Sequence, residues 1–75
     1  MAVANVDEFV RLVPTVKRSP EGTVWISYDA EGDTLYVNFR KPARATDSEL
    51  TDDDVIVRYE DGEVIGYTVL HASQR

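Results

Sequence analysis

Two β-hairpin signals between residues 23 and 70 constrain the fold of this chain more than any other feature. In the first, residues 23–29 and 34–39 alternate between apolar and polar side chains around a turn that contains Gly32. In the second, residues 55–60 and 63–70 flank the dipeptide Asp61-Gly62. Alternating β-branched and aromatic residues on both sides of turn-forming residues predict antiparallel strand pairs. The sequence therefore predicts a small antiparallel four-stranded sheet of two hairpins.

A short N-terminal helix is predicted before the sheet, which makes the fold class α+β. Apolar residues recur with helical spacing at Val6, Phe9, Val10 and Val13. Asn5 and Glu8 resemble a capping box, and Pro14 is expected to end the helix. We interpret residues 1–75 as a single domain, in which the helix and a connector occupy residues 1–22 and the β region occupies residues 23–73.

The size and composition of the chain point to self-association. A domain of 75 residues buries only about 60% of its unfolded surface, and without cysteine it has no disulfide to add stability. Oligomerisation is the remaining route, so we expect a homodimer or a larger assembly. The N-terminus lacks the pattern of a signal peptide, and no apolar run reaches the roughly 20 residues that span a bilayer. We therefore expect a cytoplasmic protein that does not contact membranes.

Acidic residues are concentrated in the second part of the chain. The formal net charge is −6, and all of it comes from residues 29–75. Such a surface repels phosphate backbones, so we expect no nucleic-acid binding and consider a basic protein partner instead. Candidate partner-binding residues are Asp52, Asp53 and Asp54, although the same acids could simply keep a small protein soluble.

The face that each strand residue occupies depends on the turn at Asp61-Gly62. A two-residue loop would pair Tyr59 with Val64, whereas a three-residue loop with Gly62 in the left-handed region would pair Tyr59 with Glu63. We favour the three-residue loop because it gathers the apolar residues of this hairpin on one face. The opposite face then carries four apolar interface candidates, which are Trp25, Tyr36, Ile56 and Val64. Either the N-terminal helix or another chain is expected to cover them.

The segment between the hairpins, residues 40–54, is long for a connection without structure of its own. It suggests a functional loop or a link across the sheet. The interpretation that we favour is structural, with Ser48 or Asp52 capping a short turn and Leu50 filling one edge of the core.

No residue pattern in the chain predicts catalysis, a cofactor or a metal site. The turn Asp29–Asp33 begins like a calcium loop, but Thr34 and Arg40 occupy positions where such a loop requires glycine and a bidentate acid. His71 is the single histidine, and a relay with Ser73 would need an orienting acid that nothing in the sequence identifies. We therefore expect a protein that is not an enzyme and uses no cofactor.

The chain resembles the domain-of-unknown-function family 2283 of small bacterial proteins. The resemblance covers residues 23–73, and it rests on Tyr28-Asp29, Glu31, Asp33, Leu35-Tyr36, Ser48-Glu49-Leu50, Val55, Val57, Tyr59, Asp61-Gly62, Ile65-Gly66, Leu70 and Ala72-Ser73. Glu60 and Tyr67 depart from the usual pattern. The resemblance implies a small antiparallel sheet without catalytic residues and a role beside toxin-like partner proteins.

Together these observations predict a non-enzymatic protein–protein interaction module. Two alternatives remain open at this point. One is an antitoxin-like inhibitor of a basic partner protein, and the other is a homo-oligomeric structural or ligand-binding protein with a site between subunits.

Overall fold

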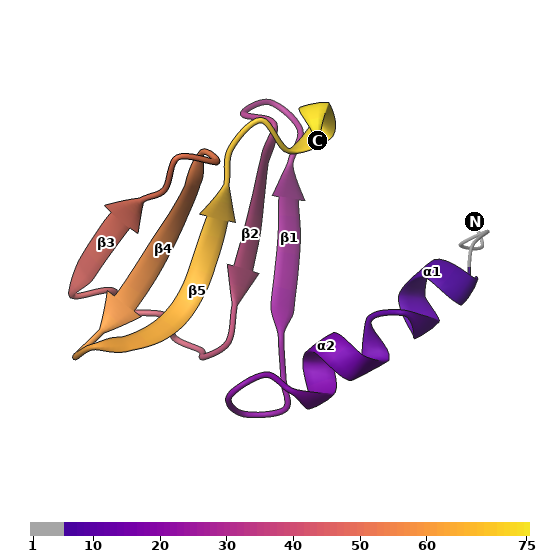
Figure 1. Ribbon diagram of the computed structural model, residues 1–75, viewed down its shortest axis with the longest axis horizontal. Helices are drawn as coiled ribbons and strands as arrows, with labels where there is room; N and C mark the ends of the chain where they lie inside the picture. Colours follow the sequence, from indigo (N-terminus) through magenta and orange to yellow (C-terminus); the bar gives the residue numbers. More distant parts are fainter. Residues whose placement is uncertain (1–5) are drawn as a thin grey trace.

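The computed structural model describes residues 6–75, and within them it contains a single antiparallel sheet and two short α-helices (Figure 1). The strands of the described chain lie in the order β1-β2-β5-β4-β3. Their bounds are Trp25–Asp29 for β1, Thr34–Asn38 for β2, Asp47–Leu50 for β3, Val55–Glu60 for β4 and Glu63–Val69 for β5. A 3-10 turn, η1 (Ala72–Gln74), ends the chain. The α+β class is confirmed, but the sheet has five strands in residues 6–75 rather than the four predicted.

The first hairpin places its alternating apolar residues on one face. Ile26 lies opposite Val37, and Tyr28 lies opposite Leu35. Strand β2 continues the sheet through β5, where Val37 is opposite Tyr67, and Tyr67 is in turn opposite Val57 of β4. Because directly paired residues share a face, one side of the sheet collects apolar side chains from four strands. We call it the apolar face, and its members are Ile26, Tyr28, Leu35, Val37, Val55, Val57, Tyr67 and Val69.

The prediction of a three-residue loop between β4 and β5 is wrong. Tyr59 pairs with Val64 and Glu60 with Glu63, so the loop has two residues. Asp61 and Gly62 have φ angles of 50° and 86°, which is the pair of left-handed residues that a tight hairpin turn requires. The register then shifts between Arg58 and Tyr59. This bulge restores the alternation beyond it, so Tyr67 still faces the same side as Val57.

Residues 47–50 of the segment between the hairpins, for which a functional loop or a link across the sheet was predicted, form the edge strand β3. Ser48 lies opposite Arg58, and Leu50 lies opposite Ile56 with 61% of its surface exposed. The predictions that Ser48 or Asp52 caps a turn and that Leu50 fills an edge of the core are therefore wrong. Thr51 caps the turn after β3, because its hydroxyl oxygen accepts hydrogen bonds from the amides of Asp53 and Val55. Charged residues are common on edge strands because they discourage pairing with further chains, and they remove the apolar alternation by which a strand is recognised.

Two helices precede the sheet, α1 (Val6–Val10) and α2 (Val13–Lys17), and together we call them the helical arm. Pro14 lies in the first turn of α2, where proline is favoured, and does not end the helical region as predicted. The predicted cap at Asn5 lies outside the described residues. Figure 1 shows that the arm leaves the sheet beside β1 and projects away from it. The helical arm therefore covers neither face of its own sheet.

The consequence is a protein with very little interior. Among residues 6–75 the only apolar side chain that is fully buried is Ile65. The whole chain exposes 5849 Å², whereas a compact monomer of 8.4 kDa exposes about 4,600 Å². Its radius of gyration is 13.3 Å, against about 11 Å for a compact domain of this length.

Candidate binding surface

The apolar face is a candidate binding surface because its side chains have no covering layer. Its outermost members, Ile26 and Tyr28, are 49% and 52% exposed. Toward the end of the sheet where the arm begins, the rings of Phe39 and Tyr67 meet edge to face, with centroids 5.4 Å apart. Side chains in this layer shield one another, but no second layer of secondary structure in residues 6–75 covers them. A sheet face of this kind normally packs against another element.

The apolar face has an acidic border on the side of β3. Asp47 lies opposite Tyr59, and Glu49 lies opposite Val57, so both carboxylates share the side of the apolar residues. Within the described part of the chain neither of them forms an ion pair. Basic groups on a molecule that covered this face would meet these carboxylates.

The opposite face holds three of the four interface candidates. Tyr36 and Ile56 flank Thr68 in one row across the sheet, and Trp25 lies opposite Asn38 in the next row. Trp25 and Tyr36 are 39% and 38% exposed. Val64 does not join them, because the two-residue loop places it opposite Tyr59 on the side of the apolar face.

Arg58 organises the centre of this opposite face. Its Nη2 donates hydrogen bonds to the backbone carbonyl of Val37 at 3.0 Å and to Oδ1 of Asn38, both on β2. To reach them the side chain crosses β5 at Gly66, which lies directly opposite Arg58. The Nε atom of Arg58 is buried and has no hydrogen-bond partner within residues 6–75. This arrangement was not predicted from the sequence, although a glycine inside a strand signals a close approach of this kind.

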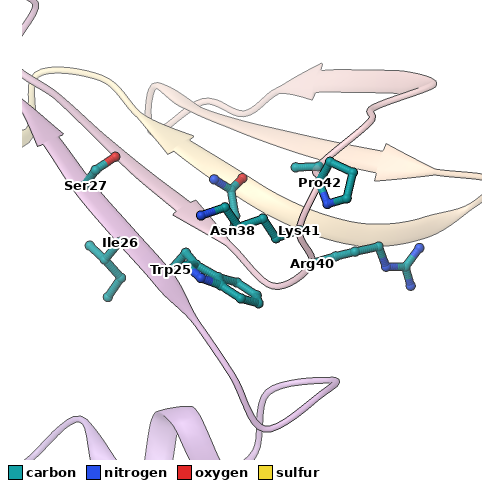
Figure 2. A pocket seen from close by; sticks show the side chains of 8 residues that line it. Trp25, Ile26, Ser27, Asn38, Arg40, Lys41 and Pro42 are labelled. Carbon is teal, nitrogen blue, oxygen red and sulfur yellow. The ribbon is translucent and has the colours of Figure 1, made fainter.

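A hollow of about 450 Å³ lies beside Trp25, between β1 and the segment that follows β2 (Figure 2). Asn38, Lys41 and Pro42 contribute to its lining. The ammonium group of Lys41 lies 5.9 Å from the centroid of the Trp25 ring, within the range of a cation–π interaction. The Trp25 ring therefore already interacts with a residue of its own chain.

Asp33 joins the turn between β1 and β2 to the C-terminal residues. Its Oδ1 accepts hydrogen bonds from the Tyr28 hydroxyl at 2.6 Å and from the Ser73 amide at 3.0 Å. Its Oδ2 accepts one from the Ser73 hydroxyl at 2.8 Å. The hydrogen bonds from Tyr28 and Ser73 lower the pKa of the Asp33 carboxyl below its ordinary value. The same bond to Asp33 raises the pKa of the Tyr28 hydroxyl.

This cluster uses Ser73 structurally. The hydroxyl of Ser73 donates to Asp33 and not to His71, so the hydrogen bonds of a serine–histidine relay are not formed. His71 is exposed and adopts a left-handed conformation with a φ of 53° just before η1. In residues 6–75 no three side chains of the histidine, cysteine, aspartate or glutamate type gather in a way that would hold a metal ion.

The three partner-binding candidates lie together in the turn between β3 and β4, at the end of the sheet opposite to the arm (Figure 1). Asp52, Asp53 and Asp54 are all exposed. Their backbone is held in place by Arg75, whose Nη2 donates to the carbonyls of Asp53 and Asp54. The carboxylates themselves form no ion pair with another described residue.

A cluster around Arg40 fixes the connector at the other end of the sheet. The guanidinium pairs with Glu60 and Glu63, each at 2.9 Å, and with Glu21 of the connector at 3.3 Å. These carboxylates raise the pKa of Arg40 further above its ordinary value. The cluster joins the segment that carries the helical arm to the turn between β4 and β5.

These features define a small α+β protein built on one antiparallel sheet, with a projecting helical arm and an uncovered apolar face. Residues 25–73 match the family model DUF2283, whose description is "Protein of unknown function", and the chain belongs to this family. The resemblance expected from the sequence is thus confirmed. No curated protein and no solved structure matches the chain. Among residues 6–75 no helix is long and apolar enough to cross a membrane.

Proposed function

We propose that this protein is a non-enzymatic protein–protein interaction module whose binding surface is the apolar face. The observation that carries this proposal is the sheet with no second layer, in which Ile65 alone among the described apolar residues is fully buried. Covering apolar surface stabilises a complex by about 25 cal/mol for each Å² removed from water. A contiguous exposed apolar patch on a sheet face is characteristic of an interaction site.

The non-enzymatic role is supported by the way the polar groups are used. Asp33 and Ser73 hold the C-terminus against the first hairpin turn, and Arg40 holds the connector. Each of these groups has a structural partner, so none of them is poised as a base or a nucleophile. We place the protein in the cytoplasm, in keeping with a sequence that contains no cysteine.

Two substitutions on the edge strand β1 test the proposed surface. Ile26→Lys adds a charge to the apolar face, and Ser27→Lys adds the same charge to the neighbouring exposed position on the opposite face. Size-exclusion chromatography with light scattering, at micromolar protein and physiological salt, measures association. We expect Ile26→Lys to weaken association and Ser27→Lys to preserve it. Equal effects of the two substitutions would contradict the proposal.

The exposed acidic turn supports a second candidate function, the inhibition of a basic partner in the manner of an antitoxin. Eight acidic residues and one basic residue occupy positions 47–63. Complementary charge of this kind mainly raises the rate and the specificity of association, and salt screens it. A partner recovered by affinity purification should bind less tightly as salt rises, and less tightly to the triple variant Asp52→Asn, Asp53→Asn, Asp54→Asn. An affinity that changed neither with salt nor with the triple substitution would count against this candidate function.

A further inference from the structure

We infer that two copies of this chain exchange their helical arms, so that α1 and α2 of each copy lie on the apolar face of the other. This inference rests on the proposed function and names the partner of the same surface as a second copy. The arrangement is reciprocal and closes on itself as a two-fold dimer, the commonest symmetry of protein oligomers.

The helical arm is itself an unpaired apolar surface. Its apolar side chains and the stem of a lysine line a shallow groove, formed by Phe9, Leu12, Val13, Val16 and Lys17. Phe9 and Val13 are 57% and 59% exposed. Each helix has only five residues, and helices shorter than about 12 residues are marginal in water without tertiary contacts. The arm therefore requires an apolar surface on which to fold.

The connector directs the arm away from its own sheet. Glu21 is held by Arg40, which also binds Glu60 and Glu63 at the turn between β4 and β5. With the connector fixed there, the arm extends beyond the β1 edge (Figure 1). Folding the arm back over its own apolar face would require the chain to reverse direction between Lys17 and Glu21. A second molecule presents the same face without that reversal.

The dimensions of the arm and of the sheet agree. The two helices of the arm are each about 7.5 Å long at about 1.5 Å per residue, and the turn at residues 11–12 between them brings the arm to roughly 18 Å. The five strands are spaced about 4.8 Å apart and span about 19 Å. An arm laid across the strands would reach from one edge of the apolar face to the other.

The charges of the two surfaces are also complementary. The acidic residues of the arm, Asp7 and Glu8, lie in its first turn. Arg11 and Lys17 of the arm and Arg18 directly after it are basic, so positive charge is concentrated toward its C-terminal end. Asp47 and Glu49 border the apolar face. An arm from a second copy would thus bring cations to carboxylates that form no ion pair within their own described chain.

The surfaces that such a dimer would bury are exposed in the single chain. Each chain exposes more surface than a compact monomer of its mass, which exposes about 4,600 Å². The exposed apolar side chains of the arm groove and of the apolar face contribute to this excess, and they are the surfaces that the exchange would bury.

Paired cysteine substitutions test the exchange directly, because the chain has no cysteine of its own. The variant Val13→Cys, Val57→Cys places one thiol on the arm groove and one on the apolar face. The full-length protein is treated with a short bis-maleimide and separated under denaturing conditions. The matched control is Thr15→Cys, Val57→Cys, because Thr15 is exposed and does not line the groove.

We expect the first pair to give a covalent dimer and the control pair to give at least several-fold less. A cross-link confined within one chain would mean that the arm folds back on its own sheet, and it would overturn the inference. Equal cross-linking by the two pairs, or none by either, would overturn it as well.

Light scattering separates this inference from the proposed function. Phe9→Asp should raise the dimer dissociation constant at least about tenfold, because burial of one large apolar side chain is lost. Thr15→Asp should leave the constant unchanged. If Phe9→Asp remained fully dimeric while Ile26→Lys dissociated, the apolar face would be the interface and the exchanged arm would be wrong. If the unmodified protein were a strict monomer, arm exchange would be wrong whatever other partner the face binds.

Discussion

Arg58 and Gly66 lie directly opposite one another on β4 and β5, and the missing side chain of Gly66 lets Arg58 cross β5. The guanidinium thereby reaches the carbonyl of Val37 and the side chain of Asn38 on β2. A single side chain thus joins three adjacent strands on one face. The pair explains why a sheet with so little interior retains a glycine at its centre, where glycine is otherwise unfavourable.

We predict that Gly66→Ala destabilises the fold. A Cβ at this position would lie 2.5 Å from Nη2 of Arg58 and close to the carbonyl oxygen of Val37. Overpacking of this kind costs about 1 to 3 kcal/mol. Urea unfolding followed by tryptophan fluorescence would measure the loss. The control is the double variant Gly66→Ala, Arg58→Ala. Gly22→Ala would not serve as a control, because Gly22 has a positive φ at which alanine is itself strained.

Removing the arginine in that double variant relieves one of the two close contacts, and the carbonyl of Val37 still opposes the new methyl group. The double variant should therefore remain less stable than Arg58→Ala alone. Equal stability of those two proteins would show that Gly66 is required only for the passage of the arginine.

We predict that Gly62→Val costs about 1 to 2 kcal/mol, because a Cβ is unfavourable in the left-handed region. Gly62 has a φ of 86° and no atoms near the position of a Cβ, so the effect would come from the backbone and not from a clash. Asp61→Asn is the matched control at the neighbouring left-handed residue, since asparagine tolerates this conformation. Thermal unfolding should separate the two variants. A melting curve unchanged by Gly62→Val would contradict the turn geometry.

We predict that the stabilisation from Asp33 disappears in acid. The pKa of Asp33 is lowered in the folded state, so the carboxylate stabilises the fold above its unfolded pKa of about 4. That stabilisation is lost as the pH falls through the lower, folded-state pKa. Asp33→Asn should thus melt at a lower temperature than the parent protein at pH 7, and the difference should shrink toward pH 3. A difference in melting temperature that did not depend on pH would mean that the charge of Asp33 contributes nothing to the stability of the fold.

The sequence was sufficient for elements that depend on local patterns. The first hairpin has regular alternation on both strands, and the structure pairs Ile26 with Val37 on one face. Gly62 was predicted in the left-handed region and is found there. The loop length was not predictable from Gly62, because both candidate turns place this glycine in that region. The bulge beyond Tyr59 decided the register, and a bulge leaves no clear signal in a single sequence.

The candidate surface is formed by contacts between residues that are far apart in the sequence, and the local pattern of apolar and polar residues does not predict such contacts. Strand β3 has acidic residues where an alternating apolar pattern would be expected, so its pairing with β4 was missed. Asp33 and Ser73 are 40 residues apart and meet only because β5 returns beside β2. Val64 was predicted on the wrong face, and the error in the register of β4 and β5 alone accounts for this. The self-association predicted from size and composition stays a prediction, and the uncovered apolar face supplies its structural reason.

We predict that Arg40→Ala weakens dimerisation at low salt and has little effect at high salt. Arg40 has three carboxylate partners, and only its bond to Glu21 holds the connector in the orientation that directs the arm outward. Charge interactions near the surface are screened over about 10 Å at 0.1 M salt and over about 3 Å at 1 M salt. Dissociation constants measured by light scattering at these two salt concentrations should therefore differ more for the parent protein than for Arg40→Ala.

Lys41→Ala is the matched control, because Lys41 contacts Trp25 and forms no ion pair with a described residue. If Lys41→Ala reproduced the salt response of Arg40→Ala, the effect would reflect the net charge of this end of the sheet, and Arg40 would not be the residue that positions the arm.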